Sequence, residues 1–303
     1  MTNTGFPHTL EGVREFAAAA ASVGEYVAHF GLTAANFTPV YREPQIDSID
    51  EIDSRLGSKA DVQDPLLSAH RLAQFYMISS GDAFLSCCEL IRKDHPRHIG
   101  SAALARSAAE HGSRLMFLAD PEIDWRKRVL RTYELFKDGL NEYKSSNHDG
   151  VSEIIKDWDN WRVRTGKEFK GVPRQSPGNN RCLITRHFDH ALAYDELSRP
   201  THGNAIWMTL AVLQEQKRTN YTWCATLRNF CFAMDVCVAA SDRLCELWDL
   251  DRDEVLLALA SQHSIPSLTW SDLSQQCEIV RVGVDMLADA VDVNLSEDPQ
   301  PRR

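Results

Sequence analysis

The sequence predicts an all-α protein, a helical bundle with additional helices toward its C-terminus. Apolar residues recur at steps of three and four along most of the chain, which is the period of an amphipathic helix. No segment shows the alternation of a β-strand, and no internal repeat is visible. With 303 residues, 43% of them hydrophobic, the chain can bury one large core or two smaller ones.

Local start and stop signals separate the helices expected in the first half of the chain. Thr9 can cap a helix that runs to about residue 29, and a polar connector at 31–61 carries one short helix at 49–56. Asp64 and Pro65 make a favourable cap and first turn for the next helix. An Asp-Pro-Glu break at 120–122 separates two later helices. The helices expected after the connector are 64–92, 99–119, 122–143 and 151–164.

The second half opens on a basic loop, residues 165–181, that is rich in Gly, Pro, Asn and Gln. Short helices are expected at 183–198 and 203–214, then the longest at 219–250, and then two more. The polar tail should be disordered. We therefore expect four parts. An N-terminal helix with an acidic connector spans 1–63, and the main bundle spans 64–250. C-terminal helices packed on the bundle span 251–295, and the tail spans 296–303.

Composition points to a protein of the reduced cytoplasm. The formal charge of −10 argues against a surface devoted as a whole to nucleic acid or anionic lipid, while a local basic patch remains compatible with it. The N-terminal residues lack the pattern of a signal peptide, and no apolar run has the length of a membrane helix. Six cysteines lie in apolar helical stretches and are expected to be reduced core thiols: Cys87, Cys88, Cys224, Cys231, Cys237 and Cys245.

The helix expected at 99–119 has small residues on nearly every side and should lie centrally, because small side chains let helices approach closely. Arg106, Glu110 and Arg114 follow at steps of four and share one of its faces, with His111 beside them. A buried stripe of this kind needs paired charges and indicates a polar site. On an exposed face it would be an ion-pair ladder, worth only about 0.2–0.5 kcal/mol per pair.

A second polar element, between Tyr194 and Asn204, joins two of the short helices. Thr201 has the side chain of a helix cap, which would place His202 at a helix start. There the helix dipole disfavours the imidazolium and leaves a neutral ring suited to proton transfer. A histidine that only satisfies the loop is the alternative interpretation.

Basic residues gather at two places. From Arg162 to Arg186 there are seven Lys or Arg against one Glu, in a run whose glycines and prolines would let it wrap an anionic partner such as RNA. A solvated loop whose charges offset nearby acids is the alternative. The second group follows Trp125 and is typical of a helix surface: Arg126, Lys127, Arg128 and Arg131.

Histidines and acids could also hold a metal among the helices. His187 and His190 form a His-x-x-His pair with Asp189 between them, and Glu110 and His202 could add ligands from other helices. The Glu-x-x-His motif of carboxylate-bridged bundles is missing at Glu110, so we assign no metal ligand. The glycine-rich motifs of nucleotide-binding proteins and the Gly-x-Ser-x-Gly motif of hydrolases are missing too, so no cofactor is expected.

Two segments together resemble a branch of uncharacterised bacterial HEPN-like helical proteins. They are LARSAAEHGSRLMFLADPEIDWRKRVLR at 104–131 and YDELSRPTHG at 194–203. The branch has an Arg-x-x-x-Glu pair, a Leu-x-Asp-Pro break followed by arginines, and a Tyr-x-x-x-Ser element followed by His-Gly. The resemblance covers about residues 66–207 and rests on Arg106, Glu110, Asp120, Pro121, Arg128, Tyr194, Ser198 and His202.

The resemblance implies a metal-independent ribonuclease of toxin or antiphage-defence type that works as a homodimer. Members of the wider HEPN superfamily pair two copies of Arg-φ-x-x-x-His, with φ usually Asn, Asp or His. The stretch from Arg106 to His111 has this spacing, but Ser107 departs from it. On a regular helix His111 lies about 140° from Arg106, whereas Glu110 lies only about 40° away. The Arg106–Glu110 pair therefore fits a shared site better.

In such a nuclease the RNA 2′-hydroxyl would attack the phosphate, with a histidine as general acid or base and an arginine stabilising the charge. His202 is the preferred histidine and His111 the second. The implied catalytic residues are Arg106, Glu110, His202, His111 and Tyr194. The candidates for substrate binding are Ser198, Arg114, Arg128, Lys170 and Arg174.

Two further functions stay open, so catalysis itself is an open expectation. One is a non-catalytic binding or regulatory module, in which Arg106, Glu110 and His202 hold the bundle together or grip a small anionic ligand. The other is a small-molecule enzyme with a metal held among its helices.

Overall fold

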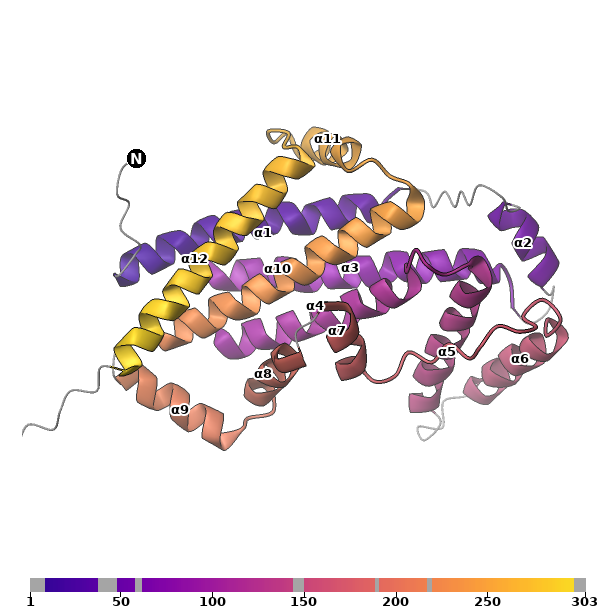
Figure 1. The fold of residues 1–303 in the computed structure, drawn as a ribbon, viewed down its shortest axis with the longest axis horizontal. Helices are drawn as coiled ribbons and strands as arrows, with labels where there is room; N and C mark the ends of the chain where they lie inside the picture. The colour runs from indigo at the N-terminus through magenta and orange to yellow at the C-terminus, as the bar shows by residue number, and fades with distance from the viewer. Residues whose placement is uncertain are drawn as a thin grey trace, which may run out of the picture.

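The computed structural model describes residues 9–37, 48–57, 62–143, 150–188, 191–216 and 220–296. Within these ranges the chain forms twelve helices and no strand (Figure 1), which confirms the all-α fold class. The helices are α1 Leu10–Ala35, α2 Ile49–Leu56, α3 Pro65–Ile91, α4 His98–Leu118, α5 Trp125–Tyr143, α6 Val151–Arg164, α7 Asn180–Phe188, α8 Ala191–Thr201, α9 Ala205–Gln216, α10 Tyr221–Trp248, α11 Arg252–His263 and α12 Trp270–Ser296.

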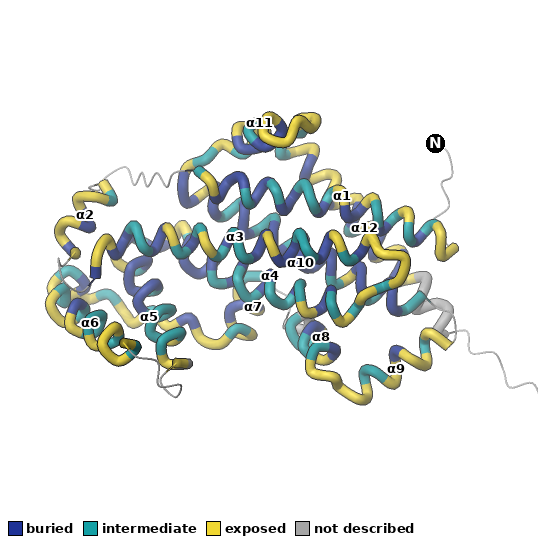
Figure 2. Tube along the Cα trace, turned by 180° about the vertical axis from the view of Figure 1, so that it is seen from behind, coloured by how far each residue is buried: buried dark blue, intermediate teal, exposed yellow. Residues whose placement is uncertain are grey.

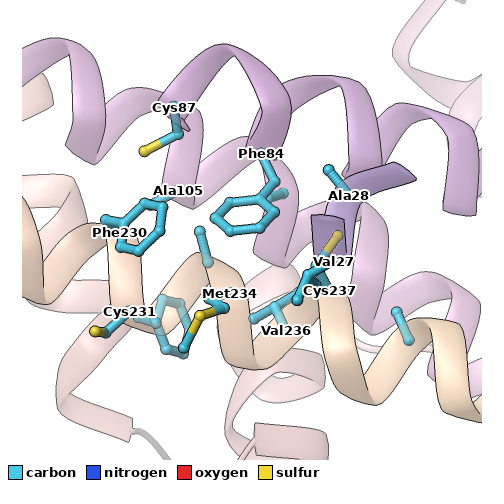
Figure 3. Close-up of a cluster of buried hydrophobic side chains, with 14 of the residues drawn as sticks. Val27, Ala28, Phe84, Cys87, Ala105, Phe230, Cys231, Met234, Val236 and Cys237 are labelled. Atoms are coloured by element: carbon cyan, nitrogen blue, oxygen red, sulfur yellow. The ribbon is translucent and has the colours of Figure 1, made fainter. Parts of the chain in front are cut away.

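Four long helices form the central bundle. Both α3 and α10 pack against each other and against α1 and α4 (Figure 1), and these four helices supply most of the larger hydrophobic cluster. Figure 3 shows part of it, with Phe84 and Cys87 beside Phe230 and Met234. The rings of Phe84 and Phe230 lie 5.4 Å apart. Burial of this apolar surface is the main term that stabilises the fold.

Helix α4 lies in the middle of the bundle, as its small residues predict. Ala105, Ala108 and Ala109 are completely buried. A Cβ atom on Gly112 would lie only 2.5 Å from Cγ1 of Val236 on α10. The backbone of α4 therefore approaches α10 more closely than any larger residue at position 112 would allow.

A second, smaller hydrophobic cluster lies where α2, α5 and α6 meet the start of α3. Its centre is aromatic: the ring of Phe169 lies 6.1 Å from that of Trp125 and 5.8 Å from that of Trp161. The Trp161 indole N–H donates to the carbonyl of Leu56 at 2.8 Å, which ties α6 to α2. Figure 2 shows α2 and α6 at one end of the molecule, with α9 at the other.

Helices α11 and α12 lie on the outside of the bundle. The first packs against α1, and the second packs against α10 and α1. Leu273 and Val284 of α12 belong to the main hydrophobic cluster. Arg281 of α12 donates to the carboxylate of Asp235 on α10 at 2.7 Å. The C-terminal helices thus extend the same core.

Several helix starts agree with their sequence signals. The Thr9 side chain caps α1 by accepting the Gly12 amide at 3.1 Å. At α2, Ser48 and Glu51 form a capping box in which each side chain accepts the other's backbone amide. These caps satisfy amides that the first helical turn leaves without partners.

Asp64 is the N-cap residue of α3 and Pro65 lies in its first turn, as the sequence predicts, but the expected side-chain cap is missing. Asp64 has φ 46° and makes no side-chain cap hydrogen bond. Asp53 of α2 caps the start of α3 instead. Its carboxylate accepts the amides of Leu66 at 2.7 Å and Leu67 at 2.9 Å. A neighbouring helix therefore supplies the cap.

Two predicted helices differ clearly from the observed ones. Helix α1 continues past residue 29 to Ala35, because Phe30, Ala34 and Ala35 extend its buried face. The single helix expected at 183–198 is two helices, α7 and α8, and α8 runs through Pro200. The expected helix start at 219 and residues 297–303 of the tail lie outside the described residues.

Candidate functional site

Four of the predicted site residues meet where α4 faces α8. We call them the Arg106 cluster: Arg106 and Glu110 on α4, Tyr194 on α8, and His202 directly after α8. Nε of Arg106 donates to Glu110 at 2.9 Å, and one terminal nitrogen donates to the Tyr194 hydroxyl at 3.0 Å. The other terminal nitrogen lies 3.0 Å from Nε2 of His202. The guanidinium also stands over the Tyr194 ring, 5.1 Å from its centroid.

The contact with Arg106 defines the proton arrangement of His202. A guanidinium has only donors, so Nε2 of His202 accepts this hydrogen bond and the neutral ring carries its proton on Nδ1. Protonation of Nε2 would place two positively charged donors against each other. The cluster therefore holds a neutral histidine whose acceptor nitrogen faces an arginine.

The Arg106 cluster is partly open to solvent. The side chains of Arg106 and Glu110 are 25% and 22% exposed, and His202 is exposed. Burial lowers the pKa of Arg106, but the hydrogen bond and the negative charge of Glu110 outweigh it, so this pKa is raised overall. The stripe predicted on α4 is thus neither a fully solvated ladder nor a sealed polar core. Its charge is paired and still within reach of a ligand.

His202 stands at the end of α8 and not at the start of the next helix, which corrects the predicted Thr201 cap. Thr201 is the last residue of α8, and its hydroxyl contacts carbonyls one turn earlier, including that of Ser198 at 2.9 Å. The amide of His202 donates to the same carbonyl at 3.0 Å. The side chain of Asn204 caps α9 by accepting the Trp207 amide at 3.0 Å. The Arg106 contact, and not a helix dipole, selects the neutral ring.

Ser198 and Arg114, both predicted to bind substrate, bond to backbone beside the cluster. The Ser198 hydroxyl donates to the carbonyl of Tyr194 at 2.7 Å. A terminal nitrogen of Arg114 donates to the carbonyl of Glu110 at 3.1 Å. Each side chain therefore supports the helix that carries a cluster residue.

His111 lies apart from the cluster, as its angular distance from Arg106 predicts. Its ring faces Tyr76 of α3, with 6.1 Å between the ring centroids. Burial and, next, the charge of Arg114 lower the pKa of His111. Its Nδ1 is buried and has no hydrogen-bond partner among the residues that the structure describes.

Arg128, which the resemblance placed among the substrate-binding residues, is a structural residue. It is 2% exposed, and its guanidinium donates to the carbonyls of Leu118 and of Ile123, the latter at 3.3 Å. Arg131 acts alongside it through an ion pair with Asp120 at 3.0 Å. The two arginines satisfy carbonyls where α4 ends and hold the corner between α4 and α5. Burial removes Arg128 from the reach of a substrate.

Lys170 and Arg174 belong to the other end of the molecule. Lys170 is exposed and follows Phe169 of the smaller hydrophobic cluster. Arg174 is 76% exposed and pairs with Glu134 of α5 at 3.1 Å. The structure does not bring either residue to the Arg106 cluster.

The metal-site candidates do not converge within the described ranges. There, no group of three His, Cys, Asp or Glu side chains has the arrangement of a metal site. Asp189 and His190 lie outside the described residues. The ring of His187 is partly buried, and burial, followed by the charge of Arg186, lowers its pKa to about 4.

All eight cysteines are free thiols, and the six that the sequence places in the core are buried. Burial raises the pKa of Cys87 to about 12 and that of Cys237 likewise to about 12. These groups are therefore protonated side chains that pack as small apolar residues.

Two polar contacts of the structure had little signal in the sequence. The Tyr133 hydroxyl and the Lys137 amine both bind the carboxylate of Asp159, at 2.5 and 2.9 Å. The spacing of four between Tyr133 and Lys137 is visible along the chain, but Asp159 comes from another helix. The second contact, between His70 and Trp248, joins α3 to the end of α10.

Together the fold and the Arg106 cluster define an all-α bundle with a partly open site of arginine, glutamate, tyrosine and histidine. Comparison of the chain with protein-family models, with curated proteins and with solved structures found no match. No helix in the described part of the chain has both the length and the apolar character needed to cross a membrane.

Proposed function

We propose that the protein is a metal-independent ribonuclease of the toxin or antiphage-defence type, with the Arg106 cluster as its active site. One observation carries this proposal: Nε2 of the exposed His202 lies 3.0 Å from the guanidinium of Arg106. Cleavage of a phosphodiester by its own 2′-hydroxyl needs a group that accepts a proton and a cation that stabilises the phosphorane. His202 and Arg106 supply these two groups side by side.

In the proposed reaction the 2′-oxygen bonds to the adjacent phosphorus while the bond from phosphorus to the 5′-oxygen breaks. The phosphate replaces His202 as a partner of Arg106, which frees Nε2 of His202 to take the 2′-hydroxyl proton. Glu110 keeps the guanidinium oriented through Nε. The leaving 5′-oxygen takes the proton of the Tyr194 hydroxyl. A water molecule then carries the proton from His202 back to the Tyr194 oxygen, so both side chains return to their starting state. The products carry a 2′,3′-cyclic phosphate and a 5′-hydroxyl.

We include in this proposal a homodimer that acts in the cytoplasm, as the resemblance implies. Helix α9 begins shortly after His202 and exposes an apolar stripe, in which Ile206, Leu210 and Leu213 are 74%, 50% and 48% exposed. Residues at this spacing share one helix face, and exposed apolar faces mark interaction sites. Light scattering after gel filtration tests the dimer, which would have twice the chain mass of 34.2 kDa.

Cleavage of end-labelled RNA in EDTA tests the activity. We expect the wild type to cleave and His202→Ala to lower the rate by about 100-fold or more, the usual contribution of a general acid or base. His95→Ala is the matched control, because His95 is exposed in the turn between α3 and α4. An inactive wild type, or equal rates for His202→Ala and His95→Ala, would overturn the proposal.

His111→Ala distinguishes this site from one built on the Arg-x-x-x-x-His spacing. Because His111 faces α3 and not the cluster, we expect the variant to keep its cleavage activity once it is folded. A folded His111→Ala protein without activity would move the site to the other face of α4.

A second candidate is a non-catalytic module in which Arg106 acts as a clasp or grips a small anion. Nε and both terminal nitrogens of Arg106 already have partners in this chain, and they join α4 to α8. The module would cleave no RNA. It predicts that Glu110→Ala loses about 1 kcal/mol of stability and lowers Tm by roughly 1–2 °C. An unchanged melting curve would contradict the clasp.

A further inference from the structure

A group of cations that form no ion pair with a described residue lies at the end of the molecule formed by α5 and α6. We call it the basic face: Arg126 at the start of α5, Arg162 near the end of α6, and Lys167 and Lys170 in the segment that follows. None of the four has an ion pair with a described residue. Glu168 is the only acidic residue from 162 to 170. The chain as a whole has a net charge of −10, so a local excess of basic residues is a departure from its overall composition.

The arginines of the basic face are held in place by aromatic rings. The guanidinium of Arg126 stands over Trp125, 5.0 Å from the ring centroid, and that of Arg162 stands over Phe169 at 4.9 Å. The two rings are neighbours, 6.1 Å apart. Arg55 also stands over Trp125, 5.7 Å from the ring centroid. Like charges on adjoining rings repel one another, and an anion bound between them relieves that repulsion.

Burial of the rings limits what the basic face can recognise. Trp125 and Phe169 are each 2% exposed, so neither ring can stack on a nucleobase or enter a lipid surface. The cations remain available for phosphate groups. Contacts to phosphates alone position a nucleic acid without reading its sequence.

We propose that the basic face binds the phosphate backbone of single-stranded RNA without base preference, at a place apart from the Arg106 cluster; this inference rests on the proposed action on RNA. In Figure 1, α6 lies at one end of the molecule, and α8, which leads to His202, lies nearer the middle. A long RNA can occupy both places, and a dinucleotide can occupy only one.

Binding of a fluorescent 2′-O-methyl RNA oligonucleotide, followed against salt concentration, tests the basic face. This probe keeps the phosphates but lacks the attacking hydroxyl, so its binding is independent of any cleavage. For Lys167→Gln/Lys170→Gln we expect weaker binding and a slope of log affinity against log salt that is shallower by about 1.4, or about 0.7 per lost contact. The control, Lys93→Gln/Arg97→Gln, removes two exposed cations at the far end of α3 and should leave the slope unchanged.

Several results would overturn this inference. The first is that the wild type does not bind the probe. The second is that Lys167→Gln/Lys170→Gln has the same salt slope as the wild type. The third is that the control variant loses as much affinity for the probe as Lys167→Gln/Lys170→Gln does. Val163 is 80% exposed beside Arg162, so phosphatidylserine vesicles form a separate arm of the test. Binding to vesicles and not to the probe would assign the face to a membrane. The wild type could bind the probe and yet never cleave an unmodified RNA. This result would support the basic face and contradict only the proposed catalysis.

Discussion

The indole N–H of Trp248 donates to Nδ1 of His70 at 3.1 Å, inside the core, where the two side chains are 1% and 0% exposed. Because Nδ1 accepts, the neutral ring of His70 carries its proton on Nε2. The contact joins the first half of α3 to the end of α10. It therefore links distant parts of the central bundle through a group that must stay uncharged.

Acid should destabilise the fold through His70. Burial, followed by the charge of Arg128, lowers its pKa from 6.5 to about 3. A group whose folded pKa is lowered contributes its full stability above the unfolded pKa and loses it as the pH falls toward the folded pKa. From about pH 6.5 to about pH 5 one such group costs about 1–2 kcal/mol. Urea unfolding across this interval measures the loss.

His70→Leu isolates the contribution of this one histidine. The variant is less stable at neutral pH, because the Trp248 indole loses its acceptor. It should also lose less stability than the wild type between neutral and mildly acid pH. Parallel curves for the two proteins would show that His70 does not titrate as its burial requires.

The close approach of α4 and α10 can be tested at Gly112. A Cβ there would lie 2.5 Å from Cγ1 of Val236, so Gly112→Ala should cost about 1–3 kcal/mol from overpacking. Gly139→Ala on α5 is the matched control, because nothing lies within 4 Å of its added Cβ. That variant should gain about 0.5–1 kcal/mol from helix propensity. Equal effects of the two changes would contradict the packing.

Asp53 should matter more than Asp64 for the start of α3. Asp53→Ala removes the acceptor of two amides and should cost about 1–2 kcal/mol in thermal or urea unfolding. Asp64→Gly should cost nothing or stabilise, since φ at this position is 46° and the side chain makes no cap hydrogen bond. A larger loss at Asp64 would restore the cap that the sequence suggests.

Much of the fold was predictable because helix signals act within one or two turns. The capping box of Ser48 and Glu51 and the cap at Thr9 are complete in the local sequence. The cap of α3 was not predictable, because Asp53 reaches it only after α2 has packed. Pro200 follows the helix end expected at residue 198, but it lies inside α8. It lacks the amide that would bond to the carbonyl four residues earlier, yet α8 continues through it and ends one residue later, at Thr201.

The candidate site was predictable only in part, for the same reason. The spacing of four between Arg106 and Glu110 defines their contact on one helix. Their contacts with Tyr194 and His202 depend on the packing of α8 against α4, which leaves no local pattern. Arg128 shows the reverse case. It follows the same Asp-Pro break as the exposed Arg126, and only the fold reveals that Arg128 is buried.

We propose that His202 and Arg106 act together on an RNA phosphate, which defines the ends of the fragments. Mass spectrometry identifies these ends in the fragments formed in EDTA from a defined RNA oligonucleotide. The wild type should give fragments that end in a 2′,3′-cyclic phosphate, and His202→Ala should give at least about 100-fold less of them. Fragments that end in a 3′-hydroxyl, or the same yield from His202→Ala, would contradict it.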